Sequence, residues 1–147
     1  MFSVFAKVYG LRFVTEPNKT TVASSGSTQT FAWQLNLTDG EKAEKLDVQF
    51  GRWDKDLDSV KGGYLLTFTQ NPSANGSVKI WILKRLQWAG DLTHDYFVAF
   101  KLFDAKLSDS GDYGIRFRVD LIPPEIGESW FTLSVQVKTH FRFNTYS

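Results

Sequence analysis

Residue types that carry catalysis or bind metals are sparse in this chain and lie in unsuitable surroundings. The 147 residues include no cysteine, which excludes thiolate metal sites, cysteine nucleophiles and redox motifs. The two histidines, His94 and His140, lie far apart, and neither has a partner histidine at metal-ligand spacing. Ser110 follows Asp109, but no serine lies in a nucleophile-elbow motif, and no glycine-rich run has the strand–loop–helix setting of a phosphate site. We therefore expect no enzymatic activity and no cofactor.

The overall charge gives no reason to expect a nucleic acid or an anionic membrane as partner. The chain has 17 basic and 16 acidic residues, a formal net charge of +1, and neither sign forms a long block. No apolar run is long enough to span a bilayer, so we expect no membrane insertion by this segment. A hydrophobic content of 42% is enough for the core of one domain. Protein surfaces remain the expected kind of partner.

Turn residues divide the chain into short segments, and almost none has the periodicity of a helix. Phe31, Trp33 and Leu35, for example, alternate with small or polar residues, as in a strand with one buried face. The pattern predicts an all-β sandwich over residues 1–138, with 139–147 a strand end or a linker to a following domain. The predicted strands are Val8–Val14, Thr20–Val22, Thr28–Leu35, Leu46–Phe50, Tyr64–Phe68, Ser77–Leu83, Arg85–Asp91, Phe97–Phe103, Ile115–Val119 and Trp130–Lys138.

The most specific motif is the run Leu107-Ser108-Asp109-Ser110-Gly111-Asp112-Tyr113, which leads into an apolar strand. It resembles the tyrosine corner of immunoglobulin sandwiches. Together with Phe13-Val14-Thr15-Glu16-Pro17 and the segment Arg85–Asp91, it makes residues 13–137 similar to a V-set immunoglobulin domain. The two extra strands before Arg85 correspond to strands C′ and C″ of that family. The resemblance implies a Greek-key sandwich of two sheets, structural roles for Gly111 and Tyr113, and an Arg85–Asp109 ion pair.

The chain departs from the family where the inter-sheet disulfide belongs. Trp33 and Ile115 stand at the two cysteine positions, and Phe50 stands at the position of the usual tryptophan of strand C. We expect these three side chains to form an apolar plug between the sheets. A disulfide contributes about 2–4 kcal/mol, and burying one more large side chain contributes about 1.5–3 kcal/mol. The plug can therefore replace the disulfide.

Disulfide-free V-like domains with a Phe-x-Thr-Glu-Pro opening are similar to surface receptors of simple invertebrates, including cnidarian allorecognition proteins. That resemblance implies the membrane-distal domain of a cell-surface receptor, extracellular, with its anchor outside this chain. It implies cell–cell recognition, either self/non-self or adhesive, by weak homophilic binding to the same domain on an opposing cell. A heterophilic receptor domain remains the near alternative.

In V-set domains the binding surface is usually the outward face of the sheet that holds strands G, F, C, C′ and C″. Strand alternation indicates which side chains lie there, because successive residues point to opposite faces. Two arginines, several polar side chains and Trp53 share this face, and Tyr64 extends the patch beyond the predicted C–C′ connection. That connection also carries Asp54, Asp56 and Asp58. The expected partner-binding residues are Asp47, Gln49, Trp53, Tyr64, Arg116 and Arg118.

Three glycosylation sequons, at Asn18, Asn36 and Asn75, fall in predicted loops or strand ends. They favour an extracellular glycoprotein.

Two functions of other classes stay open. A carbohydrate-binding sandwich would need a row of exposed aromatics, for which Trp53, Trp88 and Trp130 are the candidates. An intracellular structural spacer would fit the missing cysteines, but the extra C′ and C″ strands argue against it.

Overall fold

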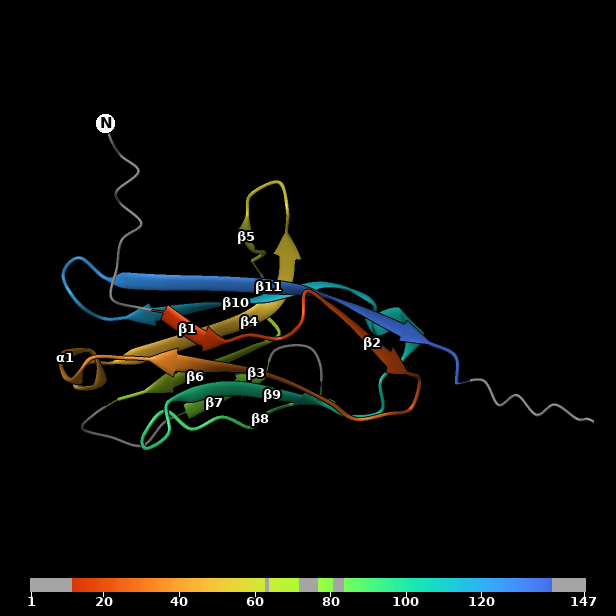
Figure 1. The fold of residues 1–147 in the computed structure, drawn as a ribbon, viewed down its shortest axis with the longest axis horizontal. Coiled ribbons are helices and arrows are strands. Elements are labelled where there is room, and N and C mark those ends of the chain that lie inside the picture. The colour runs from red at the N-terminus through yellow and green to blue at the C-terminus, as the bar shows by residue number, and fades with distance from the viewer. Residues whose placement is uncertain (1–11, 63, 72–76, 81–83, 139–147) are drawn as a thin grey trace, which may run out of the picture.

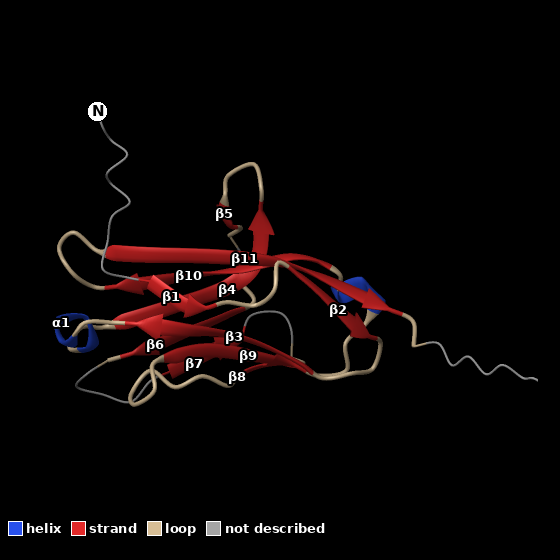
Figure 2. Ribbon diagram, viewed as in Figure 1, coloured by secondary structure: helices blue, strands red, loops and turns tan. Residues whose placement is uncertain are grey.

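The computed structural model describes residues 12–62, 64–71, 77–80 and 84–138. Nearly all of the regular structure in these residues is β, and the described helical elements are one short α-helix and one 3₁₀ turn (Figure 2). The elements in chain order are β1 (Arg12–Thr15), β2 (Thr20–Ser24), β3 (Gln29–Asn36), α1 (Asp39–Lys42), β4 (Leu46–Asp54), β5 (Ser59–Val60), β6 (Leu66–Gln70), β7 (Ser77–Ile80), β8 (Leu86–Trp88), β9 (Phe97–Leu102), η2 (Leu107–Asp109), β10 (Gly111–Val119) and β11 (Glu125–Gln136).

The strands form two packed sheets (Figure 1). One sheet has the order β1-β3-β9-β8, and the other has the order β2-β11-β10-β4-β6-β7, with β5 paired to β4. Neighbouring strands are antiparallel except β2, which runs parallel to β11. The order is that of a variable-type immunoglobulin sandwich, with β6 and β7 as C′ and C″. The predicted fold class is confirmed.

The alternation in the sequence accounts for the core. In β10, Tyr113, Ile115 and Phe117 are buried and face the buried residues of β3 and β9 across the sandwich. Arg116 and Arg118, which alternate with the buried residues of the strand, are only partly buried and point to the opposite face. This period of two gives the sheet one apolar face for the core and one polar face for the surroundings.

Several predicted strand ends are wrong. β11 begins at Glu125 rather than at Trp130, because residues 125–129 pair with β10 back to Val119. β4 continues beyond the predicted end at Phe50 to Asp54. Parts of the predicted strands Val8–Val14 and Ser77–Leu83, and the whole of 139–147, lie outside the described residues.

The segment after β3 is a one-turn helix, which is not among the elements predicted from the sequence. The Thr38 Oγ1 accepts a hydrogen bond from the Glu41 amide at 3.2 Å, and Glu41 Oε1 accepts one from the Thr38 amide at 2.7 Å. This reciprocal pair is a capping box, and its Thr-x-x-Glu signature is present in the sequence. The Asp39-Gly40 pair inside it is equally typical of a turn, which is why the local pattern is ambiguous.

Trp33 occupies the centre of the core, where an immunoglobulin domain usually has its disulfide. Its side chain is 0% exposed, and its ring lies 6.5 Å from that of Phe50, 6.1 Å from Phe100 and 6.0 Å from Phe131, between centroids. The indole Nε1 donates to Ser129 Oγ at 2.8 Å, so the buried N–H has a partner. Ile115, at the other cysteine position, is also fully buried.

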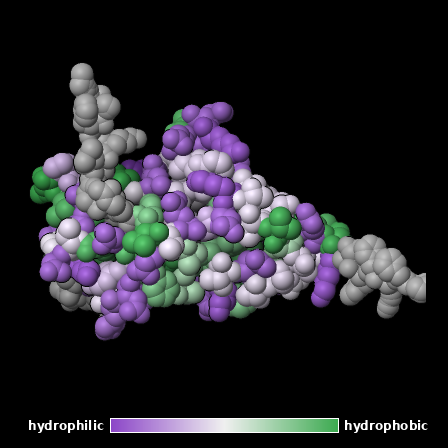
Figure 3. All heavy atoms as spheres, viewed as in Figure 1, coloured by the Kyte–Doolittle hydropathy of each residue, from purple (hydrophilic) through white to green (hydrophobic). Residues whose placement is uncertain are grey.

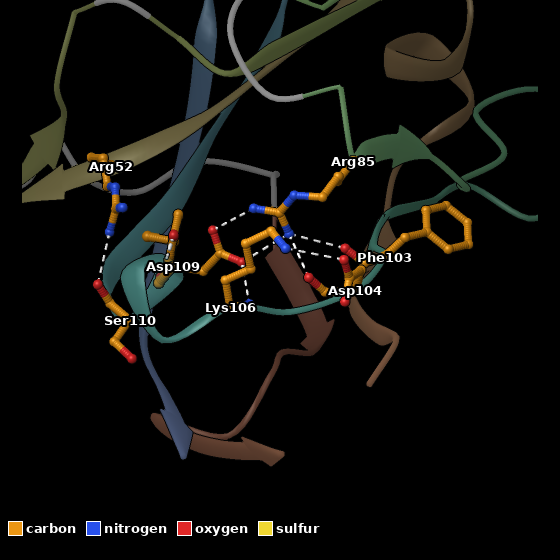
Figure 4. A network of polar contacts seen from close by, with 8 residues as sticks. Arg52, Arg85, Phe103, Asp104, Lys106, Asp109 and Ser110 are labelled. Carbon is orange, nitrogen blue, oxygen red and sulfur yellow. Dashed lines mark hydrogen bonds and ion pairs between the residues drawn. The ribbon is translucent and has the colours of Figure 1, made fainter. Parts of the chain in front are cut away.

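The turn into β10 is held by a polar network (Figure 4). Arg85 Nη2 lies 2.8 Å from Asp109 Oδ1, and Arg85 Nη1 lies 3.0 Å from Asp109 Oδ2, so the expected ion pair is present and bidentate. The Tyr113 hydroxyl donates to the carbonyl of Asp109. Gly111 has a φ of 146°, a backbone conformation that residues with a side chain rarely adopt. Burial raises the pKa of Tyr113 to about 12. The geometry is that of a tyrosine corner.

Burial opposes the ionisation of Asp109, but hydrogen bonds from Arg85 and from the Lys106 amide outweigh it and hold the pKa of Asp109 below its usual value. Arg85 also donates to the carbonyls of Phe103 and Asp104 at 3.0 and 2.8 Å (Figure 4). One carboxylate and one guanidinium therefore tie η2 to the loop after β9.

Candidate interaction site

The outward face of β4, β6, β10 and the start of β11 carries an open groove of about 600 Å³. Every residue expected from the sequence to bind a partner lines it, except Trp53. The lining residues, which we call the groove, are Asp47, Val48, Gln49, Tyr64, Thr67, Thr69, Arg116, Arg118, Pro124 and Ile126.

Strand register explains why residues distant in sequence meet here. Arg116 of β10 pairs with Gln49 of β4, which pairs in turn with Thr67 of β6. One step along, Arg118 pairs with Asp47, and Asp47 pairs with Thr69. Two polar rows therefore run across three strands, because residues paired across a sheet point to the same face.

Most charges in the groove are already engaged. The Asp47 Oδ1 accepts a hydrogen bond from Thr69 Oγ1 at 2.6 Å, and its Oδ2 lies 3.9 Å from Lys45 Nζ. Arg118 Nη2 lies 3.3 Å from Asp120 Oδ1. These contacts hold the side chains of the Arg118–Asp47–Thr69 row in place.

Arg116 differs from its neighbours. Within the part of the chain that the structure describes, no carboxylate lies within ion-pair distance of its guanidinium, and no hydrogen bond engages it. The side chain is partly buried between Gln49 and Glu128, its register neighbours on either side. A guanidinium presents five donors in a planar fork that suits a carboxylate. The groove therefore holds an unpaired cation suited to an anionic group.

Trp53, which the sequence predicts to be exposed on the binding face, is buried in this structure. It lies on the outward side of β4 as strand alternation requires, yet only 5% of it is exposed. The β4–β5 hairpin folds across β10 and β11, and the Trp53 ring stacks on that of Trp130 at 6.4 Å between centroids. Gly114 makes room for it, since a Cβ there would lie 2.4 Å from Trp53 Cε3. Alternation indicates the face of a residue but not what covers that face.

The β4–β5 hairpin projects past β11 (Figure 1) and is largely hydrophilic (Figure 3). Its turn is held by Asp54, whose Oδ1 accepts hydrogen bonds from the amides of Asp56 at 2.9 Å and Leu57 at 3.2 Å. Leu57 is 73% exposed. We call Asp56, Leu57 and Asp58 the acidic tip. The sequence places these aspartates in the C–C′ connection. It does not predict that Leu57 is exposed, because the turn geometry directs that side chain outward.

The base of the hairpin is fastened to β10 and β11. Ser59 Oγ donates to Glu128 Oε2 at 2.9 Å, and Lys55 Nζ lies 3.5 Å from Asp112 Oδ2. The Nζ atoms of Lys55 and Lys19 lie 5.0 and 4.5 Å from the Trp130 ring centroid. These contacts hold the hairpin over β11 and cover the tryptophan pair.

The row of exposed tryptophans that carbohydrate binding would need is not formed. Trp53 is buried, Trp88 stacks on Phe68 at 4.1 Å between centroids, and Trp130 lies between two lysines. The sequons at Asn18 and Asn36 are exposed, whereas Asn75 lies outside the described residues.

The described part of the chain contains no group of three His, Asp or Glu side chains placed to hold a metal ion. His94 lies with Asp91 and Thr93 in the β8–β9 connection, and His140 lies outside the described residues. No helix among the described residues has the length and apolar character needed to cross a bilayer.

Solved structures with this arrangement are immunoglobulin domains. The structure of Dpr1 IG1 bound to DIP-eta IG1 is similar over 86% of this chain and 95% of that one, with 16% identity and a TM-score of 0.52. A marsupial T cell receptor covers 92% of this chain and is covered over 59% of its own, with 14% identity and a TM-score of 0.60. Murine CRIg covers 88% and is covered over 98%, with 11% identity and a TM-score of 0.58.

No family model and no curated protein matches the sequence. At identities this low the structural similarity defines the fold alone. The protein is an immunoglobulin-like sandwich of the V-set type that has no disulfide.

Proposed function

We propose that this is the membrane-distal recognition domain of a cell-surface receptor, and that its groove-bearing face binds the same domain on an opposing cell. The observation that carries the proposal is the groove on the outward β4–β6–β10 face, with Arg116 unpaired inside it. Solvent reaches the partly buried Arg116 guanidinium, and its donors are available to an acceptor supplied by a partner. Asp47, Gln49, Tyr64 and Arg118 share the groove and are the other proposed contact residues.

The groove is a suitable size and composition for protein recognition. It combines two arginines and a tyrosine, types enriched at binding hot spots, with apolar surface from Ile126 and Pro124. A patch of this kind gives weak binding between two copies, and many copies at a cell contact give avidity. One of the similar structures consists of Dpr1 IG1 bound to DIP-eta IG1, and this example supports a protein partner for the present domain.

The proposal includes an extracellular location, glycans at Asn18, Asn36 and Asn75, an allorecognition or adhesive role, and no catalysis. Residues Trp33, Phe50, Arg85, Asp109, Gly111, Tyr113 and Ile115 are assigned structural roles. We propose no direct membrane contact by the described domain.

Bead aggregation tests the proposal. Beads densely coated with the wild-type domain should cluster with one another and should exclude beads that carry a sequence-divergent immunoglobulin domain. Arg116→Glu should abolish clustering, because it replaces the unpaired cation by an anion. Lys101→Glu is the matched control, since it makes the same charge change on β9 of the other sheet. Wild-type beads that fail to cluster at every density would overturn homophilic binding.

A further inference from the structure

We propose that the groove receives the acidic tip of a second copy of this domain. The inference rests on the proposed homophilic function and specifies which surfaces meet. Asp56, Leu57 and Asp58 of one copy enter the groove of the other, where a tip carboxylate pairs with Arg116. Leu57 then packs against Ile126 and Pro124 of the groove.

The tip carries two carboxylates without a partner among the described residues and one exposed apolar side chain. The Asp54 carboxylate already satisfies the turn amides, so the carboxylates of Asp56 and Asp58 are not needed to hold the turn. Among the described residues, neither carboxylate has an ion pair or a hydrogen bond. Leu57 is exposed between them, which costs solvation free energy until an apolar surface covers it.

The groove presents the complementary set. Arg116 is a cation without a partner among the described residues, while Arg118 and Asp47 beside it are engaged. Ile126 and Pro124 add apolar surface to the lining. Unpaired anions and one exposed apolar side chain on the tip thus match an unpaired cation and apolar lining in the groove. This charge complementarity identifies the tip of a second copy as the occupant.

A chain cannot fill its own groove in this conformation. The hairpin is fastened over β11 by the contact of Ser59 with Glu128 and the contact of Lys55 with Asp112. No residue of the acidic tip lines the groove. Since each copy has one tip and one groove, two copies related by a two-fold axis can make the same contact twice.

Exchanging the charges tests the contact. Asp56→Lys removes a tip anion, and Arg116→Glu removes the groove cation. Each variant alone should lose self-clustering on beads and should weaken dimerisation in analytical ultracentrifugation by at least about tenfold, the loss typical of breaking a desolvated charge pair. Beads carrying Asp56→Lys mixed with beads carrying Arg116→Glu should cluster with each other, because the swapped charges attract again.

Two controls separate this inference from the proposed function. Asp95→Lys makes the same charge change as Asp56→Lys at an exposed position in the β8–β9 connection, and it should leave clustering unchanged. Circular dichroism verifies that each variant folds. If wild-type beads cluster and Asp56→Lys beads cluster equally well, the tip contact is refuted while homophilic binding stands. Failure of the mixed variants to cluster also refutes the contact. Failure of the wild type refutes the proposed function itself.

Discussion

Trp33→Ala should be the most destabilising single change in the core, because Trp33 stands where the disulfide of other immunoglobulin domains holds the sheets together. The side chain is fully buried and contacts three aromatic rings at centroid distances of 6.0 to 6.5 Å. Truncating a buried tryptophan costs about 3–5 kcal/mol. Loss of the indole hydrogen bond to Ser129 adds to this, so we expect the upper end of that range.

A loss of this size is a large fraction of the stability of one domain, which is about 5–15 kcal/mol. Urea denaturation followed by far-ultraviolet circular dichroism measures it, with the m-value compared to verify that the same transition is observed. Trp130→Ala is the matched control: the same residue type is removed from the outward face, where its ring is only partly buried. We expect that variant to lose far less.

Ser129→Ala isolates the polar part of the same site. Ser129 Oγ accepts from Trp33 and donates to Glu16 Oε1 at 2.6 Å, so its removal leaves the buried indole N–H without a partner. An unsatisfied buried group costs about 1–3 kcal/mol. A loss for Trp33→Ala no larger than that for Trp130→Ala would refute the view that Trp33 replaces the disulfide.

Two further predictions concern the outward face and the corner. Gly114→Ala should cost about 1–3 kcal/mol in the free energy of unfolding, because the new Cβ would lie 2.4 Å from Trp53 Cε3 and 2.7 Å from the Ser129 carbonyl oxygen; urea denaturation measures it. The pKa of Asp109 is lower in the folded state, so its stabilisation is complete above pH about 4 and is lost as the pH falls through the folded pKa. Asp109→Asn should therefore lower the melting temperature at neutral pH and reduce its further decline in acid.

Each of these predictions has a control within the chain. Gly62→Ala should be nearly neutral, since no atom lies within 4 Å of a Cβ built there. Asp120→Asn removes an exposed carboxylate beside Arg118, and the melting temperature at neutral pH should stay close to that of the wild type. Equal losses for the two glycine variants, or an unchanged acid profile in Asp109→Asn, would contradict the packing and the ion pair respectively.

Much of the fold could be predicted because it depends on local pattern. Strand alternation places Ile115 and Phe117 in the core and Arg116 on the surface, and the structure has them there. The Asp-x-Gly-x-Tyr run predicts the corner, since its short-range backbone geometry needs a glycine at Gly111 and a hydroxyl at Tyr113. The ends of β4 and β11 could not be predicted, because they depend on how far a neighbouring strand offers hydrogen-bond partners.

The candidate site also has some features that follow from local sequence pattern and others that depend on contacts between distant segments. The sequence by itself determined which side chains share the outward face. Successive residues of a strand point to opposite faces, so burial of their neighbours places Arg116, Gln49 and Asp47 on the outward side. Only the tertiary structure decided that Trp53 is covered, because a hairpin folded over Gly114 is a contact between distant segments. It also decided which charges form ion pairs and which have none among the described residues, because pairing depends on distances in space that strand alternation does not specify.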